Sequence, residues 1–507
     1  MQLKRHVLRL FFFCLLLASG LAGCRPAPTP NDVTAPERQS IQLHIACPNE
    51  ETASLLRSRG RSWALRRDVK IDIQIYDPSK DAEQQTQALT TADVWIIAPA
   101  DLPHWAAAGK VVSLPNTYKA PDNPLAWSDL LPTWREQLVQ WDGKAFAFPL
   151  FGEAPLCCYR SDLLKAPAHE AALRGLLGRD FNGPLTWEQF AQLAEHFRSK
   201  GMSGQPGPSL PPLPRNDAGL DRLFYTLTAG FARRAVRQEE ERSAYSPDDV
   251  FSFHYNFETG QPRIAAPGFV HALKLLQRLQ ACRPVEPADH PEEAFLNGQA
   301  VLCLTDAPWL VTFQKTPALR DKVGVCRIPG GDRYFDFRTG QERKPFGASN
   351  WLPYLGGAGW LAVVSSSSRN TEAAFELLAD LAGPKTSTQI FLGSIGQGGP
   401  TRTGQLYRHR WDTFDLNEKQ TMHLRDFLEE TLLHRNLKNP VLCLRTPRQA
   451  LHRAVLVRGL REALLKGADA EKTLQNVAAE WSKLDREQGL AEHKADYRRS
   501  LGLLAKE

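Results

Sequence analysis

The fold is indicated first by residues 69–98, which read VKIDIQIYDPSKDAEQQTQALTTADVWIIA. Residues 69–76 alternate apolar and polar side chains, so they predict a half-buried strand. Residues 92–98 are nearly all apolar, as in a strand that is covered on both faces of a parallel sheet. Upstream, residues 41–47 predict another strand, and residues 50–67 are long enough for a helix. This succession predicts the opening of a doubly wound α/β domain.

The rest of the chain also alternates between strands and helices. Further strands are expected at residues 146–150, 155–159, 323–328 and 359–364, and helices at 102–108, 186–197, 267–281, 291–297, 371–382, 447–466 and 470–485. Thr186 is predicted to cap its helix, with Gln189 at the capping-box position. Residues 201–214 are rich in Gly, Pro and Ser and predict a loop. Residues 329–353 predict a second long loop.

The N-terminus has the pattern of an export signal. Three basic residues are followed by an apolar run and by LAGC at residues 21–24. LAGC resembles a bacterial lipobox, so residues 1–23 are expected to be a lipoprotein signal peptide and Cys24 to be acylated. An ordinary cleaved signal is the alternative. Residues 24–40 contain several prolines and predict a flexible tether to the membrane.

Composition limits the classes of function. Without residues 1–23 the formal charge falls from +6 to +3, so nothing favours nucleic-acid binding. Of nine cysteines, seven remain after the signal and Cys24, and they lie in apolar runs, so buried free thiols are expected. Adjacent Cys157 and Cys158 lack the spacing of a metal or redox motif. No metal ligand and no cofactor site is predicted.

Several short motifs occur in an order that resembles a known family. They are DVWII (93–97), AGKVVSL (108–114), DGKAFAFP (142–149), YRSDLL (159–164), PLTWEQ (184–189), AFLNGQAV (294–301), DAPW (306–309), GAGWLAV (357–363) and the helical stretch 454–484. From about residue 41 to residue 484 the chain resembles the extracellular solute-binding proteins of ABC importers. The resemblance is to the carbohydrate-binding family that includes maltose-binding protein.

The resemblance implies a two-lobed, type II periplasmic-binding-protein-like α/β fold with a ligand cleft between the lobes. Lobe 1 is expected to comprise residues 41–153 and 358–402, and lobe 2 residues 154–357 and 403–507. Glycine-rich hinge crossings are expected near residues 152–155, 356–359 and 399–404, because hinges absorb changes in φ and ψ; ordinary loop glycines are the alternative. Residues 201–262 and 329–353 depart from the family pattern.

The resemblance also implies ligand-binding residues. Trp309 matches a tryptophan that stacks on ligand, and Glu153 matches a cleft carboxylate. Other candidates lie at predicted strand or crossing ends: Asp101, Asp306, Trp351, Trp360 and Arg402. Alternative places are the core for Trp309 and Trp360, and a solvated hinge position for Glu153. Ile97 and Ala98 stand where the family often carries a stacking aromatic residue.

The implied function is capture of a small polar solute, most often a mono- or oligosaccharide, and its delivery to an ABC permease in the membrane. The protein is expected in the cell envelope, anchored on the extracytoplasmic side. One alternative is a sensor or scaffold on the same fold. A surface polysaccharide hydrolase is another, although the sequence has no G-x-S-x-G, H-E-x-x-H or Walker A motif.

Overall fold

The computed structural model describes residues 41–503, except 79–84, 86–88, 178–182, 203, 394–397, 413–415 and 434–436. The predicted signal peptide, Cys24 and the tether lie outside the described residues. Residues 41–507 form one compact unit. Within the described part, no helix has both the length and the apolar character that crossing a bilayer requires.

The first sheet is built from the opening strands that the sequence predicts. Its order is β2-β1-β3-β13-β6, with bounds Val69–Ile75, Ile41–Cys47, Val94–Ile97, Trp360–Val364 and Ala147–Phe151. β1 pairs in parallel with β2 and β3, whereas β13 is antiparallel to β3 and β6. Every residue of β3 is buried, as its continuous apolar run predicts. The late strand β13 therefore returns to lobe 1 after the chain has built much of lobe 2.

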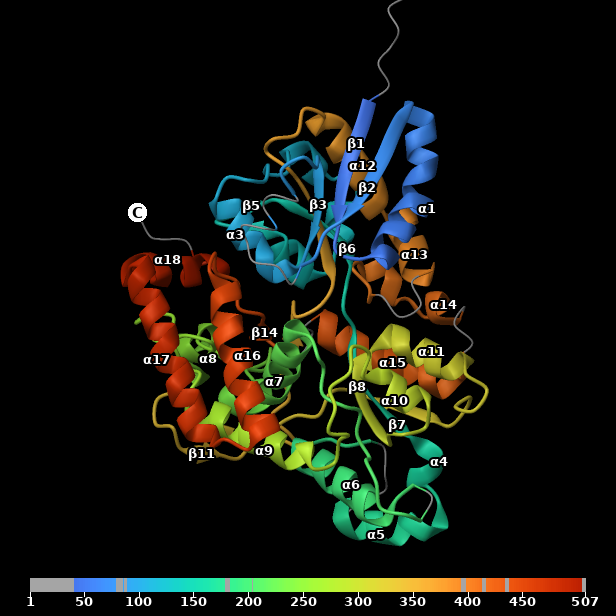
Figure 1. The fold of residues 1–507 in the computed structure, drawn as a ribbon, viewed down its shortest axis with the longest axis vertical. Coiled ribbons are helices and arrows are strands. Elements are labelled where there is room, and N and C mark those ends of the chain that lie inside the picture. The colour runs from blue at the N-terminus through green and yellow to red at the C-terminus, as the bar shows by residue number, and fades with distance from the viewer. Residues whose placement is uncertain are drawn as a thin grey trace, which may run out of the picture. The chain divides into compact units, whose positions relative to one another are not determined.

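Helices cover both faces of this sheet (Figure 1). Three of them pack together on one side: α1 (Glu50–Arg67), α12 (Thr371–Ala382) and α13 (Pro384–Gly393). On the other side lies α3 (Leu102–Ala107). The sequence sets the start of α1 because the Asn49 side chain accepts a hydrogen bond from the Thr52 N–H at 2.8 Å.

The second sheet has the order β8-β7-β9, with all neighbours antiparallel. Its strands are Leu302–Asp306, Pro155–Arg160 and Val323–Cys326. The surrounding helices are α4 (Ser161–Leu164), α5 (Pro167–Leu177), α6 (Trp187–Lys200), α10 (Glu292–Leu296), α11 (Ala307–Lys315) and α15 (Glu418–Leu432). Thr186 caps α6 as predicted, but Gln189 accepts from the Leu185 N–H instead of completing a capping box.

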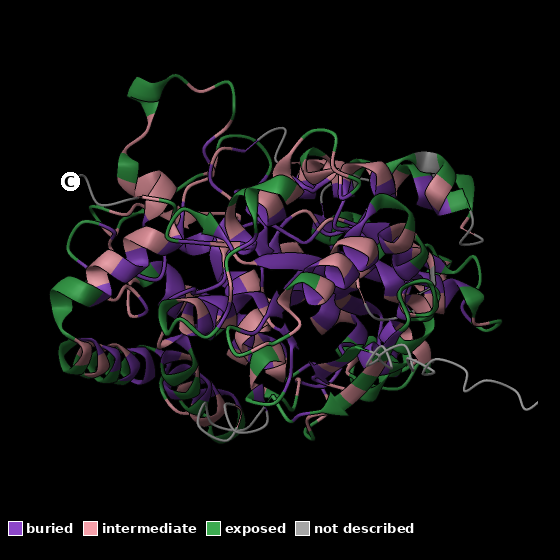
Figure 2. Cartoon of the chain, turned by 90° about the horizontal axis from the view of Figure 1, so that it is seen from above, coloured by how far each residue is buried: buried purple, intermediate pink, exposed green. Residues whose placement is uncertain are grey.

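A group of longer helices completes lobe 2. They are α7 (Asp217–Ala232), α9 (Pro267–Gln280), α16 (Gln449–Lys466), α17 (Ala470–Gln488) and α18 (Leu490–Ser500). The closest packing joins α7 to α9 and α16 to α17, around a second core cluster that includes Phe224, Trp481 and Tyr497. Residues 201–262 thus contain the long buried helix α7, which the sequence analysis does not predict. Figure 2 shows how far the buried residues extend through the unit.

Short elements occupy the remaining segments. The loop at residues 329–353 carries a small hairpin of β10 (Tyr334–Phe335) and β11 (Glu342–Arg343). The other short elements are β4 (Gln140–Trp141), β5 (Lys144–Ala145), β12 (Tyr354–Leu355), β14 (Val441–Leu442), α8 (Pro247–Phe251) and α14 (Arg408–Trp411). β12 pairs in parallel with β14, which brings the C-terminal third of the chain beside residues 356–359.

Three glycine-containing segments meet where the chain passes between the two sheets. Gly152 and Gly399 exchange backbone hydrogen bonds of 3.0 and 2.8 Å. A Cβ on Gly152 would lie 2.0 Å from the Pro400 carbonyl oxygen, so only glycine permits this approach. Gly356, at φ +81°, donates its N–H to Glu153. The crossings are therefore hydrogen-bonded to each other, while the exact lobe boundaries stay a prediction.

The second sheet also gathers cysteines. Cys158 lies opposite Cys303 on β8, and Cys157 lies opposite Cys326 on β9. All seven cysteines of the described part are buried and free, as the sequence predicts: Cys47, Cys157, Cys158, Cys282, Cys303, Cys326 and Cys443.

Candidate functional site

Three charged side chains meet at the crossing between the sheets. Asp306 ends β8, Glu153 follows β6, and Arg222 lies on α7. The Arg222 guanidinium donates two hydrogen bonds to the Asp306 carboxylate, of 2.6 and 2.9 Å. Its Nη2 also lies 3.6 Å from Oε2 of Glu153. Because bidentate pairing fixes orientation as well as distance, the cation is held between the two carboxylates.

The two carboxylates differ in their protonation. Although burial acts to raise it, the charge of Arg222 holds the pKa of Asp306 below its ordinary value. Glu153 is only 2% exposed, and burial raises its pKa to about 7 against the charge of Arg222 and the N–H of Gly356. Glu153 therefore exchanges a proton near neutral pH, whereas Asp306 stays charged.

Helix α7 positions Arg222 and separates two cavities. The helix starts at Asn216, whose side chain accepts a hydrogen bond of 2.7 Å from the Gly219 N–H. Its buried apolar residues recur at helical spacing: Leu220, Phe224, Leu227 and Phe231. Arg222 and Asp221, which lie beside this apolar stripe, face different cavities.

The larger cavity has a volume of about 390 Å³. Its polar lining comes from α7, β8 and the segment before α10: Asn216, Arg222, Thr226, Arg283, Asp289, His290, Glu292 and Thr305. Its apolar lining includes Trp309, Leu223, Leu304 and the prolines of residues 211–214. The hydroxyl of Thr305 is buried and has no hydrogen-bond partner among the described residues. The cavity therefore offers both apolar surface and polar side chains to a small molecule.

Trp309 forms an aromatic part of the wall of this cavity. It is the third residue of α11, is partly exposed, and lies at a tilt of 33° on Phe313, with ring centroids 5.8 Å apart. The helix that carries it begins immediately after Asp306, the partner of Arg222. One strand–helix junction thus sets the positions of the aromatic ring and the ion pair.

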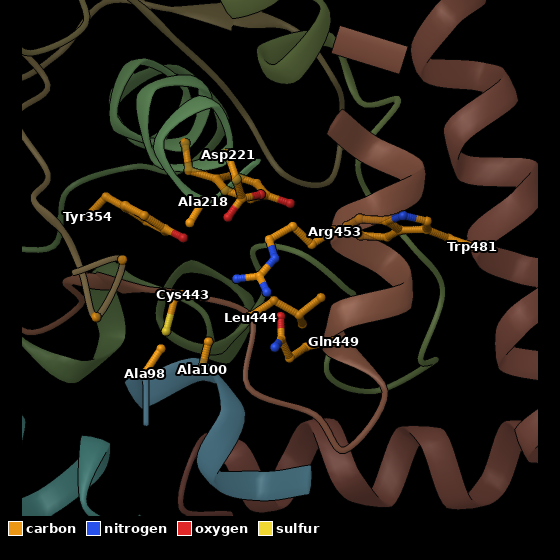
Figure 3. A pocket seen from close by; sticks show the side chains of 13 residues that line it. Ala98, Ala100, Ala218, Asp221, Tyr354, Cys443, Leu444, Gln449, Arg453 and Trp481 are labelled. Carbon is orange, nitrogen blue, oxygen red and sulfur yellow. The ribbon is translucent and has the colours of Figure 1, made fainter. Parts of the chain in front are cut away.

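The smaller cavity has a volume of about 50 Å³ and lies on the other side of α7. Its lining comes from both lobes: Ala98, Ala100, Ala218, Asp221, Tyr225, Tyr354, Gly356, Gly357, Cys443, Leu444, Gln449, Arg453 and Trp481. Figure 3 shows the guanidinium of Arg453 directed into the space between Asp221, Tyr354 and Cys443. Burial raises the pKa of Asp221 to about 7 against the charge of Arg453. At this volume the cavity has room for only a few waters.

Asp101 lies beside the smaller cavity and contacts its lining. Its Oδ1 accepts a hydrogen bond of 2.5 Å from Nε2 of Gln449, which joins the segment after β3 to α16. Burial raises the pKa of Asp101 against the charge of Arg453. Asp101 thus takes part in a polar contact between the lobes.

Of the seven sequence candidates, only Trp309 is part of the lining of either cavity, and three others lie away from the ion-pair group and Asp101. Trp351 is 1% exposed, and the guanidinium of Arg327 lies over its ring at 5.0 Å. Trp360 starts β13 and packs against the first core cluster. Arg402 is 1% exposed, and its guanidinium donates to the carbonyl oxygens of Ala382, Leu125 and Ala126 and to Asp129. These contacts give Arg402 a structural part within lobe 1.

Comparison with known proteins agrees with this architecture. Residues 67–406 match the family described as bacterial extracellular solute-binding protein. The chain belongs to this family. No curated protein matches the sequence of this solute-binding protein.

Solved structures share the two-lobed fold. Maltose-bound T. maritima MalE3 has a TM-score of 0.64 and 19% identity, with 88% of this chain and 100% of that chain covered. An ABC transporter solute-binding protein from Agrobacterium radiobacter K84, in complex with ribitol, has a TM-score of 0.64 and 18% identity over 88% and 98% of the two chains. The sugar-binding protein MalE from Xanthomonas citri has a TM-score of 0.61 and 15% identity over 89% and 99%.

Sequence reasoning did not find several residues of this solute-binding protein's cavities. Arg222 and Asp221 belong to α7 and Asn216 caps it, all within residues 201–262, which depart from the family pattern. The signal was present, because Asn216 precedes apolar residues at positions 220, 224, 227 and 231. Arg453 lies on a helix that was predicted, but its orientation depends on the packing of α16 against α7.

Neither cavity holds a recognisable metal centre. Among the described residues, one group of His and Asp side chains brings its ligand atoms together, and it lies in the C-terminal helices of the solute-binding protein. Its members line neither cavity.

Proposed function

We propose that this solute-binding protein captures a mono- or oligosaccharide, or a related polyol, in the larger cavity beside Trp309. It then delivers the ligand to an ABC permease in the membrane. The observation that carries the proposal is the pairing of an aromatic wall with a row of polar side chains in one cavity of about 390 Å³.

The size of the cavity suits this class of ligand. Small-molecule sites in proteins typically enclose about 300–1,000 Å³, and the larger cavity falls within that range. The smaller cavity is too small for a sugar ring unless the lobes separate. Because it is lined by Ala98 and Ala100 of lobe 1 and by Arg453 of lobe 2, lobe separation would enlarge it.

The chemistry of the lining suits a polyhydroxylated ligand. A sugar ring presents apolar C–H faces, which pack on a flat aromatic side chain, and a rim of hydroxyl groups that both donate and accept hydrogen bonds. Trp309 supplies the flat surface. Arg222 and Asn216 supply hydrogen-bond donors.

Capture of ligand would be coupled to lobe closure through the crossing. Arg222 contacts the cavity on one side and, on the other, Asp306 and Glu153, whose carboxylate accepts from the Gly356 N–H. A ligand favours closure only to the extent that it binds the closed state more tightly. The ion-pair group therefore gives a bound ligand a direct connection to the hinge.

The proposed location in the cell envelope rests on the N-terminal residues 1–24. We propose that residues 1–23 are removed, that Cys24 is acylated, and that residues 24–40 tether the binding protein near its permease. Mass spectrometry of the membrane-extracted protein tests this directly. We expect the Cys24→Ser variant to carry no lipid and to be recovered entirely in the soluble fraction. Full retention of that variant in the membrane would contradict the lipid anchor.

The test of ligand class uses purified residues 25–507. Maltose, ribitol, acarbose and cycloalternan, the ligands named for similar structures, serve as the first probes. A ligand present at a hundred times its dissociation constant adds about 2.7 kcal/mol to the stability, which a thermal-shift assay detects. A broad panel of sugars and polyols without any stabilisation would refute the carbohydrate proposal.

Two tryptophan variants then test the site. Trp309→Ala is expected to weaken the affinity for the ligand by about 30-fold or more, as for an aromatic contact worth about 2 kcal/mol. Trp127→Ala is the matched control, because Trp127 is also partly exposed and packs against the same core cluster as Trp309, but it lines neither cavity. Equal affinities of the two variants would remove Trp309 from the site.

A further inference from the structure

Three buried ionisable side chains meet in the C-terminal helices. His452 lies on α16, Asp485 on α17 and His493 on α18. Each side chain is at most 1% exposed, and one potential ligand atom from each lies within 4.8 Å of the others. Gly489, at φ +100°, separates α17 from α18 and allows the chain to turn there. Residues far apart in sequence thus converge on one buried point.

The two nitrogens of His452 have different partners. Nδ1 lies 3.0 Å from the Arg448 carbonyl oxygen, which can only accept, so Nδ1 carries the proton. In the neutral ring, Nε2 then has a lone pair, and it lies 2.8 Å from Oδ1 of Asp485. Histidines that bind metals show this arrangement, in which one nitrogen donates to a backbone carbonyl and the other faces the ion.

His493 and Asp485 leave polar atoms unpaired. Nδ1 of His493 lies 3.3 Å from Oδ1 of Asp485, but the two are not aligned for a hydrogen bond. Neither ring nitrogen of His493, nor Oδ2 of Asp485, has a hydrogen-bond partner among the described residues. A buried polar atom without a partner destabilises the fold.

One spacing in the group already suits a small divalent ion, whereas the 2.8 Å between Nε2 of His452 and Oδ1 of Asp485 would lengthen when the ion binds. Ligand atoms at about 2.0–2.1 Å from a tetrahedral zinc ion lie about 3.3 Å apart, and Nδ1 of His493 lies 3.3 Å from Oδ1 of Asp485. The Tyr255 hydroxyl donates to the same Oδ1 at 3.3 Å, and its ring stacks on Trp481. Ligating carboxylates usually accept such a supporting hydrogen bond.

We infer that His452, Asp485 and His493 bind one divalent transition-metal ion of the zinc class, which fastens α18 to α16 and α17. A set of two imidazoles and one carboxylate binds such ions in preference to the harder calcium and magnesium ions. The ion also supplies positive charge to the buried Asp485 carboxylate. A proton shared between His452 and Asp485 would leave the nitrogens of His493 without partners.

The experiment uses the mature chain, purified from zinc-supplemented medium and analysed for metals by mass spectrometry. About one zinc ion per chain is expected. Removal of the metal by a chelator should lower Tm, and added Zn²⁺ should restore it. Reconstitution with Co²⁺ should give the visible absorption of a tetrahedral nitrogen–oxygen site. These measurements on the unaltered chain do not depend on whether any variant folds.

Variants then assign the ligands. His493→Gln and Asp485→Asn should lose the metal, and His493→Cys should regain zinc because a thiolate also ligates it. Tyr255→Phe should weaken metal affinity about 10- to 100-fold. His254→Gln is the control, because His254 is buried outside the group and should leave the metal content unchanged. The inference is overturned if the purified chain contains no metal and its Tm does not change when Zn²⁺ or Co²⁺ is added. Full metal content in both His493→Gln and Asp485→Asn also overturns it.

Discussion

Replacing Glu153 by glutamine should change the way in which stability depends on pH. Burial raises the pKa of Glu153 from 4.5 to about 7 in the folded protein, so the folded state binds this proton more tightly than the unfolded chain does. The favourable contribution is complete below about pH 4.5 and is lost as the pH rises to about 7. Glutamine keeps an oxygen that can accept from the Gly356 N–H, but it never ionises.

The size of the effect follows from the pKa shift. At about 1.36 kcal/mol for each unit, the shift corresponds to about 3 kcal/mol that the parent protein loses between pH 4.5 and 7. An entropy of unfolding of about 2.1 cal/mol/K per residue converts this into about 3 °C of Tm for a folded unit of this length. Glu153→Gln should therefore match the parent near pH 4.5 and melt about 3 °C higher at pH 8.

Calorimetry of the parent and of Glu153→Gln between pH 4.5 and 8.5 measures the difference in Tm. The titration of all other groups is common to both proteins and cancels in this difference. Glu136→Gln is the control, because Glu136 is exposed and pairs with Arg135 on the surface. A difference in Tm between Glu153→Gln and parent that does not change with pH, or that shrinks as the pH rises, would refute the reasoning.

Three further substitutions test the frame around the site. Gly152→Ala should lower the free energy of unfolding by about 1–3 kcal/mol, because its Cβ would lie 2.0 Å from the Pro400 carbonyl oxygen. The control Gly175→Ala has open space and should be neutral or stabilising. Thermal unfolding of both variants measures the difference. Arg402→Leu should lower stability by about 3 kcal/mol or more, because buried carbonyl oxygens lose their donors, while calorimetric ligand affinity stays unchanged. A weaker affinity would instead return Arg402 to the ligand site. Thr186→Ala should cost about 1 kcal/mol in urea unfolding through the lost cap, and no change would contradict the capping role.

The sequence predicted the elements with a strong period and missed several others, among them helix α7, which follows a loop. β1, β2 and β3 were found because their alternation, or their continuous apolar run, is local information. Helix α7 was missed because the Gly- and Pro-rich residues before it dominated the reading of residues 201–262. A helix start at Asn216 with apolar residues at helical spacing was nevertheless present.

Candidate site residues were chosen from the family resemblance and from local position, and their contact with a ligand stays a prediction. Glu153 was proposed from the resemblance and Asp306 from its place at a strand end, and the structure brings both to one guanidinium. Their partner Arg222 is 69 positions from Glu153 along the chain, and no local sequence pattern predicts that the two side chains meet. Arg402 was chosen for its place near a crossing, but only tertiary structure shows that backbone carbonyls occupy its donors.

The free cysteines that lie opposite one another in the second sheet affect the conditions under which the protein can fold. Burial raises the pKa of Cys157, Cys158 and Cys303 well above the ordinary range, so the finished sheet keeps these thiols protonated and slow to oxidise. Before the strands pair, the same residues are accessible. In an oxidising compartment, sensitivity to oxidants would therefore be confined to the interval before β7, β8 and β9 assemble. Preparation under reducing conditions should matter during refolding and cease to matter once the native fold has formed.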